Sequence, residues 1–164
     1  MGSRAGEGPE AAVTDPRTAA VDLPSENGMA AAARASVRAF LESVPGAGLE
    51  ERDLDEICVV VQEACTNAIR HAHGHDATKR FRVDVSLRDG GVEILVRDQG
   101  APFDLDTSER PLRPELLQEG GYGIHIMRTW MDAVAVTHDG TGNVLRLWRR
   151  CDRARRGEGD LVAR

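Results

Sequence analysis

The sequence predicts one α+β domain, a two-layer sandwich in which helices cover one face of a mixed, mostly antiparallel sheet. Strand-like runs occur in adjacent pairs joined by short turns, and helical runs with a single apolar stripe lie before and between the pairs. Strands joined by a short turn pair antiparallel, whereas a doubly wound parallel sheet needs a helix after each strand. The 164 residues are 41% hydrophobic, which is enough for one domain with its own core.

Composition and turn residues define the first elements. Residues 1–16 are rich in Gly, Ala, Pro and Glu without apolar periodicity, so we expect disorder there. Residues 18–23 predict a short strand that ends at Pro24. Ser25 is the expected N-cap of a helix that runs to about Ser43.

A second helix is expected over residues 50–73, where apolar residues recur at helical spacing. The stripe consists of Leu54, Ile57, Val61, Ala64 and Ala68. Gly74 is a natural stop for this helix. Cys58 and Cys65 lie in the same pattern without a Cys-x-x-Cys partner, so buried packing is the favoured role for both.

Two strand pairs follow. Residues 81–87 and 92–96 alternate apolar and polar side chains around an Asp-Gly-Gly turn, which predicts a β-hairpin. Residues 133–137 and 144–148 form the second predicted pair.

The connection between these pairs, residues 99–120, is rich in proline and glycine. A segment of this length inside a compact domain is typical of a lid. We expect a short helical turn around residues 115–118 within it and a short helix over residues 121–131 after it.

Charge and hydropathy limit the functional classes. The net charge of −6 gives no overall attraction to nucleic acid, and no apolar run approaches the length of about 20 residues that a membrane helix needs. We therefore expect a soluble, cytoplasmic protein, folded over residues 17–150 and followed by a flexible basic tail, 151–164. Arginines gather near this end, and a solvated strand edge and tail is favoured over a polyanion site; they are Arg146, Arg149, Arg150, Arg153, Arg155 and Arg156.

The first motif that carries chemistry is Glu63 with Asn67. Residues four apart on a helix share a face. A carboxylate can act as a general base, and an amide oxygen can bind Mg²⁺ without adding negative charge beside phosphates. By itself, an ordinary solvent-facing pair is the more common meaning of this spacing.

Two further motifs follow it along the chain. Asp98 and Gly100 close the predicted hairpin, where a carboxylate can accept a hydrogen bond from a ring amine while the glycine backbone passes close by. The Gly120-Gly121-Tyr122-Gly123 run opens a helix, where backbone N–H groups can approach phosphate oxygens. This run is neither a Walker A loop nor a dinucleotide fingerprint.

A histidine cluster at the end of the second helix, His71, His73 and His75, looks like a metal site together with Asp76. Residues two apart do not share a helix face, so ordinary packing is favoured.

Taken together, the three motifs resemble the Bergerat-fold (GHKL) ATPases, which include sensor histidine kinases, Hsp90 chaperones and type II topoisomerases. The resemblance spans residues 53–147. Its runs EACTNAIRH at residues 63–71 and GYGIHIMRTWMD at residues 121–132 look most like the anti-sigma factor serine/threonine kinases.

That resemblance implies ATP and Mg²⁺ as cofactors and assigns roles to individual residues. Glu63 would be the general base, Asn67 the Mg²⁺ ligand and Asp98 the partner of the adenine amine, with Gly100 leaving room for the ring. The phosphate loop would comprise Gly121, Tyr122, Gly123 and Ile124. The family's Gly-Thr before the last strand aligns either with Gly142-Asn143 or with Gly140-Thr141, so Thr141 is a further candidate binder.

The resemblance also implies partners: a sigma factor that is sequestered, and an anti-sigma factor antagonist (STAS-type) protein that is phosphorylated on Ser or Thr. A homodimer is implied on the same ground. An alternative is an ATP-binding partner-switching module without kinase activity. A histidine kinase fragment is disfavoured, because residues 1–50 contain no long helix pair to present a phosphoacceptor histidine.

Overall fold

A computed structural model describes residues 15–88, 90–108 and 122–151. Five strands form one sheet in the order β1-β2-β3-β5-β4, and every neighbouring pair is antiparallel. The strands are β1 Thr18–Pro24, β2 Arg80–Arg88, β3 Gly91–Arg97, β4 Ala133–His138 and β5 Asn143–Arg150. The predicted α+β class and both strand pairs are confirmed, and no described pair is parallel.

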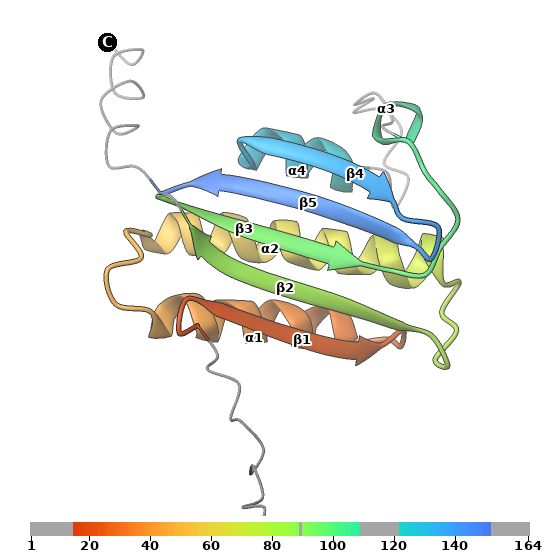
Figure 1. Ribbon diagram of the computed structural model, residues 1–164, viewed down its shortest axis with the longest axis horizontal. Helices are drawn as coiled ribbons and strands as arrows, with labels where there is room; N and C mark the ends of the chain where they lie inside the picture. Colours follow the sequence, from red (N-terminus) through yellow and green to blue (C-terminus); the bar gives the residue numbers. More distant parts are fainter. Residues whose placement is uncertain (1–14, 89, 109–121, 152–164) are drawn as a thin grey trace, which may run out of the picture.

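The helices are α1 Met29–Ser43, α2 Glu51–Asn67, the π-helix η1 Ala68–Ala72, the short α3 Leu105–Ser108 and α4 Gly123–Trp130. Of these, α1, α2 and α4 lie on one face of the sheet, whereas α3 stands off beyond the β4 edge (Figure 1). Helix α2 is central, because it packs against both α1 and α4.

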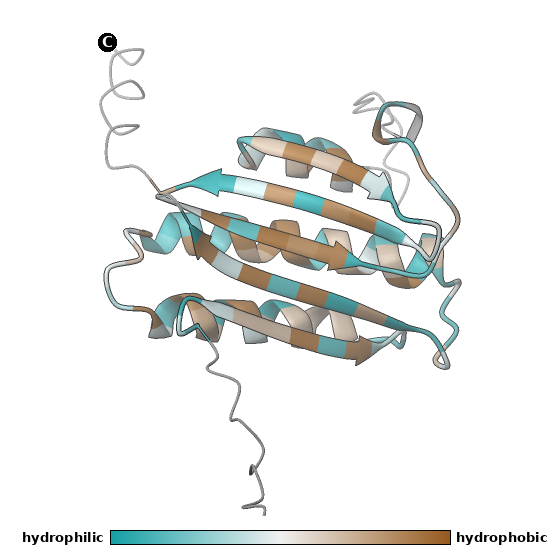
Figure 2. Ribbon diagram, viewed as in Figure 1, coloured by the Kyte–Doolittle hydropathy of each residue, from teal (hydrophilic) through white to brown (hydrophobic). Residues whose placement is uncertain are grey.

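The core lies between the helices and the sheet. Ile57, Val60 and Val61 on α2 are completely buried, and β3 contributes Val92 and Ile94. Apolar and polar residues alternate along the strands (Figure 2), so each strand presents its apolar side to the helices. Cys58 and Cys65 are buried free thiols, as the helical pattern predicts.

The start of α1 differs from the expectation. The helix begins at Met29 and follows Gly28, whose φ of 88° turns the chain from β1 into the helix, and no side chain caps it. Ser25 is not the N-cap: it is fully buried and its hydroxyl hydrogen-bonds His73. The N-cap prediction was wrong because a contact 48 residues away in sequence uses that hydroxyl.

The second helix also changes character along its length. It begins with a capping box between Glu50 and Asp53, runs as an α-helix to Asn67, and continues as the π-helix η1. The chain then leaves the helix through Gly74 and His75, both at φ 61°. The predicted extent of the helix is confirmed, whereas the π-turn had no signal in the apolar spacing.

The basic end of β5 is only partly solvated. Arg149 is 9% exposed; its guanidinium contacts Asp53 at 2.7 Å and Glu56 at 2.6 Å and donates to the carbonyl of Trp130. The prediction of a solvated strand edge was wrong for Arg149, because β4 takes the edge and β5 lies inside the sheet. Arg153, Arg155 and Arg156 lie outside the described residues, as do the helical turn at 115–118 and nearly all of the amino-terminal segment.

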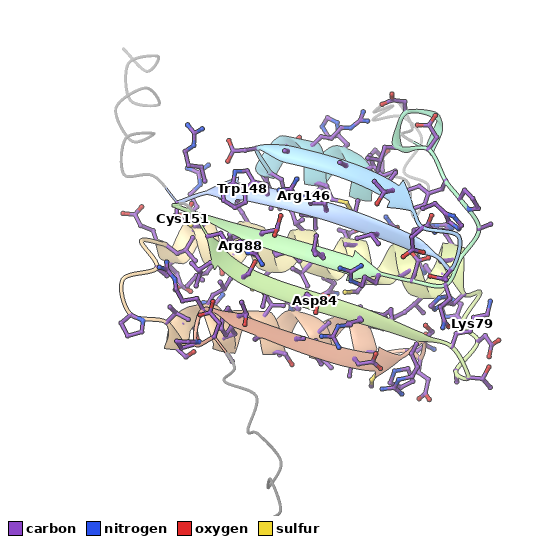
Figure 3. The ribbon with its side chains drawn as sticks, viewed as in Figure 1. Lys79, Asp84, Arg88, Arg146, Trp148 and Cys151 are labelled. Atoms are coloured by element: carbon purple, nitrogen blue, oxygen red, sulfur yellow. The ribbon has the colours of Figure 1, made fainter. Side chains whose placement is uncertain are left out.

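The other face of the sheet carries charged side chains, of which Figure 3 labels Asp84, Arg88 and Arg146. Arg146 contacts Glu93 on β3 at 2.6 Å, and Asp84 contacts Arg82 on its own strand and Arg97 on β3. Trp148 lies over Gly91, where an added Cβ would be 2.4 Å from the indole ring. Within the described ranges, no helix combines the length and the apolar character that crossing a membrane requires.

Candidate nucleotide site

A cavity of about 400 Å³ opens where α2 and η1 meet the ends of β3 and β5. Its wall comes from five parts of the chain that are far apart in sequence: α2 and η1, the end of β3, the segment after β3, the start of α4, and the start of β5. Of the predicted site residues, Asn67, Asp98, Gly123 and Ile124 line it. The volume is in the range of small-molecule sites in proteins.

At one end of this cavity, the start of α4 lies against Glu63 and Asn67 on α2. A Cβ added to Gly123 would be 3.0 Å from Oε2 of Glu63 and 3.4 Å from Nδ2 of Asn67. Gly123 is buried, so the absence of a side chain is what allows this approach. Glu63 stands beside the contact without lining the cavity, whereas Asn67 lines it.

The start of α4 is also the end of the helix where backbone N–H groups lack intrahelical acceptors. Tyr122 occupies the N-cap position and Ile124 is 8% exposed against the cavity. Gly121, the other glycine predicted for this loop, lies outside the described residues.

At the other end, Asp98 and Asn143 form one hydrogen-bonded unit. Oδ1 of Asp98 accepts from the backbone N–H of Gly100 at 2.7 Å and from Nδ2 of Asn143 at 2.8 Å. Nδ2 of Asn143 also donates to the carbonyl of Ala101 at 3.0 Å. Asn143 is 1% exposed, and its Oδ1 has no hydrogen-bond partner among the described residues.

An unpartnered acceptor is costly to bury, since it forfeits its hydrogen bonds with water. Asn143 lines the cavity, and a ligand N–H group that reached its Oδ1, which is closed to solvent in this structure, would satisfy it.

Two glycines make this end possible. A Cβ on Gly100 would be 2.5 Å from the Cβ of Ala72, and one on Gly142 would be 1.8 Å from the carbonyl oxygen of Asp98. The space beside Gly100 is filled by Ala72 of η1, so this glycine serves the contact between the loop and the π-helix; its expected role of leaving room for the ring stays a prediction.

Thr141 lies outside this unit. It is exposed in the turn between β4 and β5, where its hydroxyl donates to Oδ1 of Asp139 at 2.6 Å. That hydrogen bond is the main cause that holds the pKa of Asp139 below its usual value. The alignment with Gly142-Asn143 is the one that brings a side chain to Asp98, whereas the binding role of Thr141 stays a prediction.

Three cavity residues were missed as site residues. Arg70 and His71 line the wall from η1, three and four positions after Asn67, and that helical spacing was the available signal. Phe103, 36% exposed, adds an aromatic ring from the segment after β3. The available signal for Phe103 was the run Pro102-Phe103-Asp104, which resembles a Pro-Phe-Asp variant of the anti-sigma group.

The three histidines of the predicted cluster do not converge. His71 lines the cavity and His75 is exposed. His73 is buried and accepts a hydrogen bond from the backbone N–H of Gln99, the residue after Asp98. In the part of the chain that the structure describes, no three His, Cys, Asp or Glu side chains gather as metal ligands.

Known proteins resemble this chain in sequence. A family of histidine kinase-like ATPase domains matches residues 23–149. The serine-protein kinase RsbW of Bacillus licheniformis is 34% identical over 122 residues, which cover 70% of this chain and 76% of that protein. RsbW of Halalkalibacterium halodurans is 30% identical over 134 residues, covering 77% of this chain and 80% of the relative. RsbW of Bacillus subtilis is 33% identical over 96 residues, covering 54% and 60%.

Solved structures resemble it in fold. The crystal structure of RsbU and RsbW domains from Mycobacterium tuberculosis superposes with a TM-score of 0.59 at 20% identity, over 81% of this chain and 31% of that one. The SiaB–SiaC complex from Pseudomonas aeruginosa gives a TM-score of 0.52 at 13% identity, over 82% and 89%. At these identities the likeness concerns the fold.

Proposed function

The chain belongs to the histidine kinase-like ATPase family and, within it, to the anti-sigma factor serine/threonine kinases, and from this premise we propose that it transfers phosphate from ATP to a protein hydroxyl and sequesters a sigma factor. The acceptor in this proposal is a Ser or Thr of a STAS-type anti-sigma factor antagonist. Residues 17–150 make up the catalytic domain. Because sigma factors act on RNA polymerase, this function requires a cytoplasmic location.

One observation carries the proposal: a single cavity has an acceptor pair at one end and, at the other, the amide of Asn67 with the carboxylate of Glu63 just outside the wall. Asp98 with Asn143 forms the first end. Glu63 with Asn67, against the start of α4, forms the second. A nucleotide requires two chemically different ends, because its base and its phosphates are bound by different kinds of groups.

The base end suits adenine. The carboxylate of Asp98 accepts hydrogen bonds, and Oδ1 of Asn143 is a buried acceptor without a partner among the described residues. An exocyclic amine supplies two donors, which suits two neighbouring acceptors. Phe103 adds an apolar ring at the cavity wall.

The phosphate end suits a triphosphate with one metal ion. Asn67 supplies an amide oxygen, a ligand type that Mg²⁺ accepts when phosphate oxygens and water complete its shell. Bound Mg²⁺ supplies neutralisation of phosphate charge. Arg70 lines the same wall and adds positive charge, and the start of α4 is a helix N-terminus, whose dipole favours anions.

Glu63 is the proposed general base. It would take the proton from the attacking hydroxyl as the oxygen bonds to phosphorus, and the nucleoside diphosphate would leave. Its place beside the cavity, next to Gly123, leaves the cavity itself for the nucleotide. Positioning and charge neutralisation would account for most of the rate, as is general for phosphoryl transfer.

Transfer of labelled phosphate from ATP to the cognate antagonist tests the proposal. We expect transfer by the wild-type protein and a loss of about 100-fold or more with Glu63→Gln, because general-base catalysis contributes on that order. Glu42→Gln is the matched control, since Glu42 is exposed on α1 and pairs with Arg38. Equal transfer by both variants would reject the role of Glu63, and no transfer by the wild type would reject the kinase.

A binding module without kinase activity is the second candidate, and one observation favours it: Glu63 does not line the cavity, whereas Asn67 does. In such a module ATP holds the conformation that captures the sigma factor. Sigma-factor capture that survives Glu63→Gln and is lost in Asn67→Ala, together with no phosphate transfer by the wild type, would support this candidate.

A further inference from the structure

The peptide bond between Asp98 and Gln99 is held from both sides. Its carbonyl oxygen accepts a hydrogen bond from the backbone N–H of Asn143 at 3.1 Å, which extends the β3–β5 ladder by one residue. Its N–H, on Gln99, donates to Nε2 of His73 at 2.8 Å. Since a peptide group is planar, these two bonds fix its orientation and with it the ψ angle of Asp98.

The ψ angle of Asp98 matters because Asp98 lines the cavity and its Oδ1 is bonded to Gly100 and Asn143. A rotation of the peptide would move the backbone N–H of Gly100, which donates to Oδ1 of Asp98. The hydrogen bond between Gln99 and His73 therefore affects the orientation of Asp98 at the cavity. His73 itself does not line the cavity.

The His73 ring has a defined protonation state in this arrangement. Nε2 accepts the N–H of Gln99, so it carries a lone pair and no proton. Nδ1 lies 2.5 Å from Oγ of Ser25, and in the neutral ring it holds the proton and donates to that hydroxyl. His73 is 4% exposed and Ser25 is fully buried, so water does not replace these bonds.

We propose that His73, in its neutral form, is a positioning residue that holds the Asp98–Gln99 peptide in the orientation required for nucleotide binding. The inference deepens the proposed function and rests on it. A proton on Nε2 would face the N–H of Gln99, so the hydrogen bond would be lost and two donors would oppose each other.

The surroundings decide where this loss occurs on the pH scale. Burial lowers the pKa of His73, and Lys79, just before β2, acts in the same direction. Asp98, after β3, and Asp76, after η1, act in the opposite direction without reversing the shift. The ring is therefore neutral at pH 7, and the positioning is lost only as the pH falls below the usual histidine value of about 6.5.

Two substitutions test the two hydrogen bonds of the His73 ring one at a time. In His73→Gln the amide oxygen can take the place of Nε2 and accept from Gln99, whereas in His73→Asn the shorter amide can take the place of Nδ1 and keep only the contact with Ser25. At pH 7.5 we expect His73→Gln to bind ATP within about twofold of the wild type, and His73→Asn to bind about fivefold to tenfold more weakly, the effect of one buried hydrogen bond.

The pH profile adds a readout that a purely structural role would not change. The phosphates of ATP also titrate in this range, so the relevant quantity is the ratio of the wild-type Kd to the Kd of His73→Gln. We expect this ratio to rise as the pH falls from 7 to 5.5, because only the wild type has a ring to protonate. A flat ratio, or equal Kd values for His73→Asn and His73→Gln at pH 7.5, would overturn the inference.

Asp98→Asn distinguishes this inference from the proposed function. If Asp98→Asn loses ATP and His73→Asn does not, the nucleotide site holds and the role of His73 fails. If the wild type binds no ATP, both fail.

Discussion

Asn143 and Asp98 hold each other through three hydrogen bonds. Two join their backbones, each N–H to the other's carbonyl at 3.1 Å, and the third runs from Nδ2 of Asn143 to Oδ1 of Asp98 at 2.8 Å. The pairing leaves the buried Oδ1 of Asn143 as an acceptor at the cavity. Asn143, at the start of β5, thus orients the Asp98 carboxylate through Nδ2, and its Oδ1 is a second acceptor beside that carboxylate.

Replacing the Asn143 side chain should therefore weaken nucleotide binding. Asn143→Ala removes the donor that orients Asp98 and the unpartnered acceptor, and we expect ATP affinity to fall by about tenfold. Thr141→Ala, in the exposed turn two residues earlier, should leave the affinity unchanged. Calorimetric titration of both variants with ATP checks this. A larger loss of affinity in Thr141→Ala than in Asn143→Ala would favour the alignment with Gly140-Thr141.

Gly123→Ala should separate binding from stability. The added Cβ would be 3.0 Å from Oε2 of Glu63, so α4 or Glu63 must shift at the phosphate end. Alanine has the higher helix propensity, so we expect Tm to be unchanged or slightly raised while ATP affinity and phosphate transfer both fall. A variant that unfolds at lower temperature in proportion to its lost affinity would contradict this.

Arg149 should contribute strongly to stability. Arg149→Leu removes the buried partner that Asp53 and Glu56 share and leaves Glu56 only its pair with the exposed Arg52, so we expect the free energy of unfolding to fall by about 2–4 kcal/mol. Arg146→Leu is the control: its pair with Glu93 is exposed on the arginine side and should contribute less than about 1 kcal/mol. Denaturant unfolding measures both, and similar losses would show that the Arg149 pairs are no stronger than surface pairs.

The buried ring of His73 should make stability depend on pH. Burial lowers its pKa in the folded protein, so the unfolded chain binds more protons at this site as the solution becomes acidic. Stability is therefore complete above about pH 6.5 and falls as the pH decreases through the lowered pKa. Urea unfolding between pH 5 and 7.5 should show a smaller decline in His73→Gln; parallel declines would contradict the assignment.

Local patterns predicted most of the fold. Apolar spacing identified α2 and the shared face of Glu63 and Asn67, and alternation identified the hairpin that ends at Asp98. These features depend on neighbours in the sequence, so no knowledge of the fold was needed to find them.

The features that were missed depend on long-range contacts. The bond between Ser25 and His73 spans 48 residues, and the burial of Arg149 follows from the strand order, which pairing patterns alone do not give. The π-helix η1 changes backbone hydrogen bonds without changing the side-chain spacing that a sequence displays. The sequence offered Asn143 only as one of two alignments of the family's Gly-Thr, because its backbone pairing with Asp98 spans 45 residues of the chain.

The most direct test of the account is an ATP titration of the wild type and Asp98→Asn, each with and without Mg²⁺. An asparagine can keep the acceptor for Gly100 and Asn143, but it replaces the second carboxylate oxygen with a donor. Asp84→Asn, on the opposite face of the sheet, is the control. We predict Mg²⁺-dependent binding by the wild type and by Asp84→Asn, and a loss of about tenfold or more in Asp98→Asn; unchanged affinity in Asp98→Asn would contradict the assignment of the base end.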